Sequence, residues 1–453
     1  MSHVIAAIST GLSVSAIGIL RLTGDNCGKV AGKVFTLNSG LPLEDAPNRK
    51  LVMGTLHDKD GRVIDTCLAV FTRGPHSYTG EDTVEIQCHG SPAVLSAGLD
   101  ALYLAGARPA QRGEFTKRAF MNGQLALTQA EAVIDLIEAE TADAAANAAG
   151  QVEGVLQKKL NPIYNDLVDL CSHFHAVLDY PDEDIADFGL SSYESTLRAN
   201  AKGLNALLQT YGQGRILKQG VSAAIVGKPN VGKSSLLNAL AGYERVIVTE
   251  IAGTTRDTVE ESVMVGSTRL RLIDTAGIRE TADKVEAMGV ERSREAVKNA
   301  DLVIFVCDGS QPLTQDDHQV IDVCLDAEYS IALINKTDLG CSVVPGDLPF
   351  TVVIPVSTKT GEGLELLADT VDMMFAGNTP CDGSVLTNPR QYDAIRRAHE
   401  SILCALDGLK LGLTPDAVLT DVEEAMSAMG EVTGATVRDD ITARIFERFC
   451  VGK

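Results

Sequence analysis

The alternation of apolar and polar positions in the first quarter of the chain predicts a small α+β domain. Residues 1–117 hold several short runs with the two-residue period of strands and one stretch with helical spacing. The expected strands cover 4–8, 16–20, 63–71 and 83–87, and the expected helix covers 93–105. By itself this pattern indicates a fold class and no activity.

A different period begins near residue 118. Apolar residues recur at spacings of three and four from Ala130 to Leu156, which predicts one long amphipathic helix. Further helices are expected at about 160–178, 192–212, 390–409, 415–429 and 436–449. The helical blocks 118–218 and 377–453 flank a segment of another type, so we expect one helical domain interrupted by an inserted domain at 219–376.

Composition restricts the class of protein. The chain has 453 residues and a formal net charge of −22, whereas binding to a nucleic-acid backbone needs clustered Lys and Arg. If the protein acts on nucleic acid, we expect a partner to supply the basic surface. Its ten cysteines form no C-x-x-C pair, and apolar runs long enough for a membrane span are absent from the sequence. These features favour a soluble cytoplasmic protein with reduced thiols.

The inserted segment opens with a phosphate-loop motif. Residues 227–234 read Gly-Lys-Pro-Asn-Val-Gly-Lys-Ser, between a strand-type run at 222–226 and a helical run at 235–240. In that context backbone N–H groups can surround an anionic oxygen, Lys233 can reach the outer phosphates, and the Ser234 hydroxyl can bind Mg²⁺. The motif predicts a nucleoside triphosphate site.

Three later motifs identify the nucleotide as GTP. Residues 274–277 read Asp-Thr-Ala-Gly, 335–338 read Asn-Lys-Thr-Asp, and 357–359 read Ser-Thr-Lys, each after a strand-type run. Asp274 can hold Mg²⁺ through water. Asp338 can accept hydrogen bonds from N1–H and the exocyclic amine of guanine, which adenine cannot offer.

The residues expected to position the attacking water differ from those of Ras-like enzymes, because Ile278 stands where those enzymes have Gln. From the chemistry, Glu280, Asp283 and Glu286 are all candidates. The hydroxyl-rich loop 248–257 can close over Mg²⁺ and the γ-phosphate, with Thr255 as the second Mg²⁺ ligand. Its carbonyls, together with the side chain of Asn230, could hold a monovalent cation, although an ordinary flexible switch segment explains the loop equally well.

Two cysteines invite a functional interpretation. Cys88-His89 offers two metal-ligand types, but without further ligands at a recognisable spacing it predicts no metal site. Cys450 lies fourth from the end of the sequence, where Gly452 and Lys453 do not fit a prenylation signal. Cys450 is either a nucleophile or a thiol packed beside Phe446 and Phe449, with packing favoured.

Taken together, these stretches resemble the tRNA modification GTPases of the MnmE (TrmE) family over essentially the whole chain. The most specific matches are Gly-Ile-Leu-Arg at 18–21, Tyr-Thr-Gly-Glu-Asp at 78–82, Gly-Glu-Phe-Thr-Lys-Arg-Ala-Phe at 113–120, Gln-Ala-Glu-Ala-Val at 129–133, Ala-Gly-Thr-Thr-Arg-Asp at 252–257 and Phe-Cys-Val-Gly-Lys at 449–453. The resemblance implies a folate-binding-like dimerisation domain at 1–117, a discontinuous helical domain and an inserted Ras-like G domain.

It also implies an activity. Members of the family act with the flavoprotein MnmG, in a heterotetramer, to place an aminomethyl or carboxymethylaminomethyl group on C5 of wobble uridine in certain tRNAs. The one-carbon unit comes from a tetrahydrofolate such as 5-formyltetrahydrofolate. The resemblance further implies a homodimer, a potassium-dependent GTPase activated by pairing of G domains, and tRNA contacts made mostly through the partner.

Site residues follow from the resemblance by position. Glu286 is expected to orient the attacking water, Ser234 and Thr255 to bind Mg²⁺, and Asn230, Thr249, Ile251 and Thr254 to bind K⁺. The expected folate contacts are Arg21, Glu85, Gln124 and Lys453, although Gln124 stands where the family usually has Lys. The full set expected around the nucleotide is Asn230, Val231, Gly232, Lys233, Ser234, Ser235, Thr249, Glu250, Ile251, Ala252, Gly253, Thr254, Thr255, Asp274, Thr275, Ala276, Gly277, Asn335, Lys336, Asp338, Ser357, Thr358 and Lys359.

Two other classes share parts of this pattern. A ribosome-assembly GTPase would have a similar G domain but should carry a basic RNA-binding module, which this acidic sequence lacks. A signalling switch without a role in tRNA modification would not need residues 1–117 or the Lys453 terminus. Folate binding separates the switch from the modification enzyme.

Overall fold

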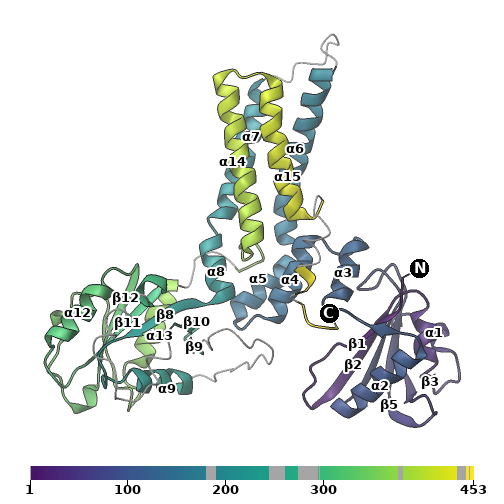
Figure 1. The fold of residues 1–453 in the computed structure, drawn as a ribbon, viewed down its shortest axis with the longest axis horizontal. Helices are drawn as coiled ribbons and strands as arrows, with labels where there is room; N and C mark the ends of the chain where they lie inside the picture. Colours follow the sequence, from purple (N-terminus) through teal and green to yellow (C-terminus); the bar gives the residue numbers. More distant parts are fainter. Residues whose placement is uncertain are drawn as a thin grey trace.

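The computed structural model describes residues 2–179, 190–243, 261–273, 294, 296–375, 381–435, 445–447 and 449–452. Three lobes are visible in Figure 1: an N-terminal lobe on the right, a second α/β lobe on the left, and a tall helical bundle between and above them. The predicted fold class, an N-terminal α+β domain with a discontinuous helical domain and an inserted P-loop domain, is confirmed.

The N-terminal lobe is a seven-stranded sheet in the order β3-β4-β5-β6-β2-β1-β7. Its elements are β1 (Ile5–Ile8), β2 (Ser15–Thr23), α1 (Cys27–Gly32), β3 (Phe35–Leu37), η1 (Leu43–Asp45), β4 (Leu51–His57), β5 (Val63–Thr72), β6 (Thr83–Gly90), α2 (Pro92–Ala105) and β7 (Arg108–Pro109). Helices α1 and α2 cover one face, where alternate residues of β2, β4, β5 and β6 form a buried core. The residues that alternate with these buried ones along the same four strands point to the opposite face of the sheet.

Three helices replace the single long helix predicted after residue 130. After α3 (Glu114–Met121), the chain forms α4 (Leu127–Ile137), α5 (Ala142–Val152) and α6 (Val155–Asp179). The Thr141 hydroxyl accepts the Ala144 N–H and so caps the start of α5. Gly154 has a φ of +83°, which separates α5 from α6. The prediction was wrong because the apolar spacing runs on across both helix boundaries.

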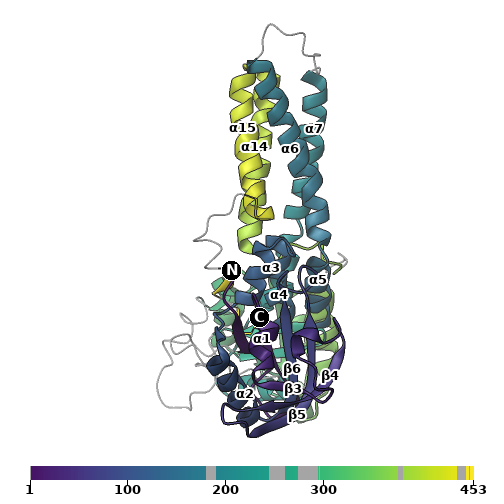
Figure 2. The ribbon, with the colours of Figure 1, turned by 90° about the vertical axis from the view of Figure 1, so that its right-hand side faces the viewer.

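Segments from the two ends of the sequence form one helical bundle (Figure 2). Helices α6, α7 (Leu190–Leu208), α14 (Pro389–Leu411) and α15 (Pro415–Thr433) share a single hydrophobic core. Helix α14 begins where the Asn388 side chain accepts the Arg390 N–H, and it ends at Gly412 with a φ of +68°. The segment 209–388 therefore leaves the bundle and returns to it.

The inserted lobe is a six-stranded sheet in the order β13-β12-β11-β8-β10-β9, with only β9 antiparallel to its neighbour. The elements are β8 (Val221–Val226), α9 (Lys233–Tyr243), β9 (Glu261–Val265), β10 (Thr268–Leu272), β11 (Leu302–Asp308), α12 (Gln315–Cys324), β12 (Tyr329–Asn335), η2 (Thr337–Leu339), η3 (Pro345–Asp347), β13 (Val353–Pro355) and α13 (Leu364–Phe375). Buried clusters lie on both sides of the sheet. Parallel strand order places the loops after β8, β11, β12 and β13 at one edge.

The connections to the inserted lobe are packed tightly against the helical domain. The incoming helix α8 (Tyr211–Gln219) approaches the returning segment so closely that a Cβ at Gly214 would collide with the Leu386 carbonyl. Asn147 of α5 is buried and its side chain bonds Gly383 N, Val385 N and Val385 O at 3.1–3.3 Å. Motion in the inserted lobe can therefore be transmitted to α5 through two adjacent connections.

A buried ion pair joins the first helical block to the second. The Glu131 carboxylate of α4 accepts two hydrogen bonds from Arg390 at 2.8 Å and one from Gln391 at 2.7 Å. We expect Glu131→Ala to lower the free energy of unfolding of the helical domain by about 3 kcal/mol, because the Arg390 guanidinium would lose its carboxylate and keep only the Glu431 carbonyl. Calorimetric unfolding measures this change. Glu194→Ala, which removes an exposed pair with Arg198, is the control and should cost no more than about 0.5 kcal/mol. Equal losses in the two variants would contradict the assigned role of Glu131.

Candidate nucleotide and folate sites

The phosphate loop joins β8 to α9 at the edge of the sheet where the parallel strands end. Asn230 and Gly232 have φ values of +67° and +106°, so the backbone turns sharply before the helix. A Cβ at Gly232 would collide with the side-chain nitrogen Nδ2 of Asn335. A Cβ at Gly227 would collide with the Val306 carbonyl. The two glycines of the motif are therefore required by the approach of β11 and β12, and the loop leads directly into the N-terminus of α9.

Lys233 lies across this loop. Its ammonium donates hydrogen bonds to the carbonyl oxygens of Gly227 at 2.6 Å and Lys228 at 2.7 Å. Burial lowers the pKa of Lys233 below its usual value. Bound phosphate oxygens would stabilise the charged ammonium, so this arrangement suits a highly anionic ligand.

Asn335 links the phosphate loop to the last motif. Its side chain is fully buried, donates to the Val231 carbonyl at 2.8 Å and accepts the Thr358 N–H at 3.2 Å. We had expected Asn335 around the nucleotide, and its observed contacts are with protein groups. Asn335 therefore holds the two ligand-binding loops in register.

Asp338 occupies the position predicted for guanine recognition. One carboxylate oxygen accepts the Ser357 hydroxyl at 3.0 Å, and the other lies 3.7 Å from the Lys359 ammonium. Ser357 is buried, whereas the Lys359 side chain is 79% exposed. The structure thus brings together the motifs at 335–338 and 357–359, with the Asp338 carboxylate only partly enclosed.

Sequence reasoning missed Asp308, at the end of β11. It accepts the Lys336 ammonium at 2.7 Å, while Lys336 also donates to the Asn230 carbonyl at 2.8 Å. Burial tends to raise the pKa of Asp308, but hydrogen bonds from Lys336 and Ser310 outweigh it and hold the pKa below its usual value. The missed signal was an Asp ending a wholly apolar run at 302–307, as Asn335 ends the next strand.

Several predicted site residues lie outside the described part of the chain. They are Thr249, Glu250, Ile251, Ala252, Gly253, Thr254, Thr255, Asp274, Thr275, Ala276, Gly277, Glu286 and Lys453. Their roles stay predictions. Val231 is buried at the base of the loop, and Ser234 and Ser235 are exposed in the first turn of α9.

A second polar cluster lies on the N-terminal sheet, on the face opposite α1 and α2. Arg21 of β2 donates to Glu85 of β6 at 2.8 Å, and its guanidinium carbon lies 5.8 Å from the ring centroids of both Tyr78 and Phe115. An Nη of Arg21 also lies 3.5 Å from the carbonyl of Gly452. The predicted folate residues Arg21 and Glu85 are thus adjacent, and the end of the chain reaches them.

The C-terminal segment is held against the N-terminal domain. Val451 forms a bridge with Arg112, and the Ser9 hydroxyl donates to the Gly452 carbonyl at 2.9 Å. Phe446 and Phe449 are buried, but Cys450 is exposed, so the favoured packing interpretation of this thiol is wrong. The backbone turns Cys450 outward while its two aromatic neighbours point into the helical domain.

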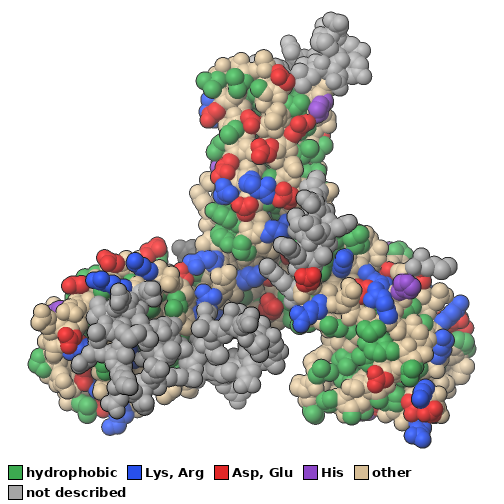
Figure 3. Space-filling view, in the orientation of Figure 1, with side chains coloured by type: hydrophobic (Ala, Val, Ile, Leu, Met, Phe, Trp, Pro, Cys, Tyr) green, Lys and Arg blue, Asp and Glu red, His purple; other side chains and the backbone are tan. Residues whose placement is uncertain are grey.

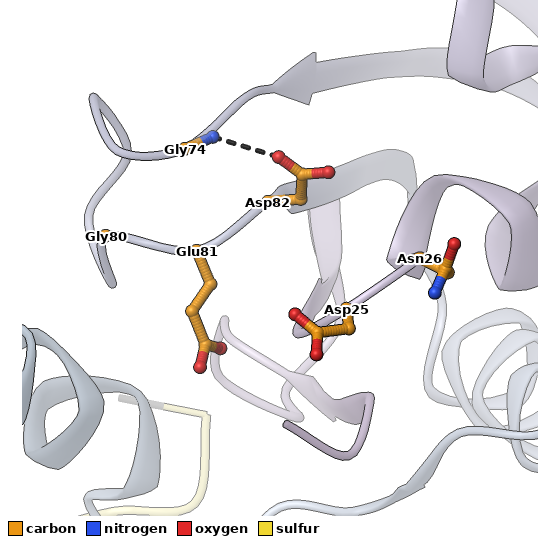
Figure 4. A pocket seen from close by; sticks show the side chains of 6 residues that line it. All are labelled: Asp25, Asn26, Gly74, Gly80, Glu81 and Asp82. Carbon is orange, nitrogen blue, oxygen red and sulfur yellow. Dashed lines mark hydrogen bonds between the residues drawn. The ribbon is translucent and has the colours of Figure 1, made fainter. Parts of the chain in front are cut away.

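Gln124 lies between α3 and α4, beside Gly80. It is exposed, and its side chain would be 3.3 Å from a Cβ built at Gly80. A cavity of about 480 Å³ beside that turn is lined by Asp25, Asn26, Gly74, Gly80, Glu81 and Asp82 (Figure 4). The three carboxylates already accept hydrogen bonds from Ser2 N, Arg118 and Gly74 N. Such a lining repels anions, so this cavity suits the carboxylates of a folate poorly, and the folate contacts of Arg21, Glu85 and Gln124 stay predictions.

The loop between β8 and α9, with Lys233 and the Asp338–Ser357 pair at the same edge of the sheet, defines a P-loop GTPase. Two family models match the chain: the GTP-binding protein TrmE N-terminus at residues 4–124 and the MnmE helical domain at 127–450.

Relatives match over almost the full length. The tRNA modification GTPases MnmE of Heliobacterium modesticaldum and Clostridioides difficile are 40% and 39% identical to this chain, each over 99% of both sequences. That of Roseiflexus castenholzii is 41% identical, again over 99% of both. The chain therefore belongs to the MnmE family of tRNA modification GTPases, as its motifs predicted. Within the described residues, every helix is too short or too polar to cross a membrane.

Proposed function

We propose that this protein hydrolyses GTP and couples hydrolysis to the modification of wobble uridine in certain tRNAs. The observation that carries the proposal is the convergence of Lys233, Asp338 and Ser357 at one edge of the sheet in a chain related to MnmE GTPases over its whole length. Lys233 would bind the outer phosphates, and Asp338 would bind the guanine. Purified protein should hydrolyse GTP and leave ATP intact; equal hydrolysis of both would contradict the proposal.

The described residues fit the metal ions proposed for this site. Ser234 lies in the first turn of α9, where its hydroxyl can bind Mg²⁺, and the left-handed backbone at Asn230 presents an exposed side chain to the loop edge. With Thr255 on Mg²⁺ and with Thr249, Ile251 and Thr254 beside Asn230 on K⁺, the two cations would neutralise charge that develops on the phosphates. Glu286 would position the attacking water.

The tRNA chemistry is proposed to need a second protein and a folate. Together with the flavoprotein MnmG, in a heterotetramer, the protein would form the carboxymethylaminomethyl or aminomethyl group at C5 of the uridine. A tetrahydrofolate such as 5-formyltetrahydrofolate would supply the one-carbon unit. The net charge of −22 supports tRNA contacts made mostly by the partner. We place this activity in the cytoplasm.

A homodimer is proposed through the N-terminal lobe. The sheet face opposite α1 and α2 exposes Ile17, Leu51 and Met53, each by more than half of its surface. On the side of this lobe that faces the viewer, Figure 3 also shows hydrophobic side chains gathered. Exposed apolar side chains of this kind favour association with another protein surface, and a second copy would bring two folate sites and two G domains into one assembly.

We expect Arg21→Ala to weaken binding of 5-formyltetrahydrofolate by about tenfold or more, because a charge-assisted hydrogen-bond donor would be lost beside the ligand. Calorimetric titration of the full-length protein measures the affinity. Arg62→Ala, at an exposed turn of the same lobe, is the control and should bind like wild type. Unchanged affinity in Arg21→Ala, or failure of wild type to bind, would remove the folate assignment and favour a signalling switch.

A further inference from the structure

Three metal-ligating side chains converge on the core side of the N-terminal sheet, outside the sites described above. Asp65 and Cys67 lie two residues apart on β5, so they point to the same face, and Cys88 lies on the neighbouring strand β6. The antiparallel register pairs Leu68 with Gln87, which places Cys67 directly opposite Cys88. Their Sγ atoms are 4.0 Å apart, and one ligand atom from each of the three residues lies within 4.8 Å of the others.

Their surroundings differ from those of ordinary core cysteines. Cys67 and Cys88 are 6% and 2% exposed, and the Asp65 side chain is only 10% exposed. A carboxylate and two thiols enclosed together offer one cation an oxygen and two sulfur ligands.

His89 completes the arrangement at the surface. Its backbone N–H donates to Asp65 Oδ2 at 2.8 Å, and its Nδ1 lies 2.9 Å from Asp65 Oδ1. The His89 side chain is 76% exposed, so Asp65 contacts a residue at the surface of the lobe. A histidine held against a ligating carboxylate is a frequent supporting contact in metal sites.

We propose that Asp65, Cys67 and Cys88 bind one thiophilic divalent cation, Zn²⁺, with His89 orienting the carboxylate and water at the fourth position. Tetrahedral zinc with Zn–S bonds of about 2.3 Å separates two sulfurs by about 3.8 Å, close to the spacing present here. Mg²⁺ and Ca²⁺ prefer oxygen ligands only, which excludes them. Binding would release the two thiol protons to solvent and leave both cysteines as thiolates.

The site would cross-link β5 and β6. Residue 88 lies three positions after Glu85 on the same strand, so the ion would brace the strand that carries the candidate folate contact without touching that contact. Its ligands come from the face opposite Glu85. Metal binding therefore tests a property of this chain that is independent of GTP hydrolysis and of folate binding.

The probe is Co²⁺, titrated into reduced, untagged, full-length protein, because thiolate ligands give cobalt an intense ultraviolet charge-transfer band and tetrahedral geometry gives strong visible bands. We expect one equivalent of Co²⁺ to bind and to be displaced by one equivalent of Zn²⁺. Cys67→Ser and Cys88→Ser should abolish the band, and Asp65→Asn should weaken binding by about tenfold to a hundredfold. Cys404→Ser, which removes an exposed thiol elsewhere, should behave like wild type.

Asp65→Asn tests metal binding without changing the two buried cysteines, so it is less prone to misfold than the cysteine variants. Circular dichroism of each variant checks the fold. Absence of the charge-transfer band in folded wild-type protein would overturn the proposal. A band that persists in Cys88→Ser, or a Cys67–Cys88 disulfide that forms instead of a metal complex under reducing conditions, would overturn it too.

Discussion

Asp338→Asn is expected to weaken GTP binding by about a hundredfold or more and to create binding of xanthosine triphosphate. The Asp338 carboxylate is an acceptor for the N1–H and amino group of guanine, and an Asn amide would place a donor where that amino group lies. Xanthine carries a carbonyl oxygen at this position, so the same amide would match it. In the structure, Ser357 and Lys359 hold the carboxylate in place from the side of the neighbouring loop.

Competition with a fluorescent guanine nucleotide measures both affinities. Asp326→Asn, at an exposed position after α12, changes the net charge equally and should leave GTP binding unchanged. If Asp338→Asn bound GTP as wild type does, the base would be recognised elsewhere. If it lost GTP without gaining xanthosine triphosphate, the substitution would have disturbed the loop, which unfolding experiments would detect.

Glu286→Ala is expected to reduce GTP turnover by about a hundredfold or more with little change in nucleotide affinity. The reason is the apolar side chain of Ile278, which cannot orient water where Ras-like enzymes use Gln. We therefore propose that a carboxylate from the same segment holds the attacking water. Single-turnover hydrolysis separates this chemical step from product release.

The other acidic residues of the segment are the matched controls. Glu280→Ala and Asp283→Ala remove the same kind of charge within a few residues and should keep most of the turnover. Full activity in Glu286→Ala would end its proposed role. Loss of activity in Glu280→Ala or Asp283→Ala instead would transfer the role to that residue.

The parts of the fold that the sequence predicted best are those where one signal decides the local structure. The β8–loop–α9 unit was predicted because two glycines and Lys233 sit between an apolar run and a helical run. The end of α5 was not predicted, since a single Gly154 among residues with continuous helical spacing is a weak signal. Strands β3 and β4 were not predicted either; β3 pairs with β4, and β4 with β5.

In the candidate site, too, short motifs predicted some residues, whereas contacts that depend on the tertiary structure were not predicted. Lys233 and Asp338 follow from short motifs; the structure shows their contacts with the Gly227 carbonyl and the Ser357 hydroxyl, and their roles toward a nucleotide stay predictions. The contacts of Asn335 with Val231 and Thr358 could not be predicted, because they depend on how closely β8, β12 and β13 approach. The pairing of Cys67 with Cys88 likewise appears only once the strand register is known, which is why Cys88-His89 alone predicted no metal site.

The proposed cation-assisted pairing of G domains is tested most directly by GTP hydrolysis in K⁺ and in Na⁺ at equal ionic strength. Size-exclusion profiles with GDP and aluminium fluoride would be recorded in both salts. We expect hydrolysis to be at least about tenfold faster in K⁺, with tighter association in K⁺ alone. The proposed site at Asn230 would bind K⁺, and the smaller Na⁺ would neutralise the phosphate charge less well there. Equal rates and equal association in both salts would contradict the proposal and remove Asn230, Thr249, Ile251 and Thr254 as a potassium site.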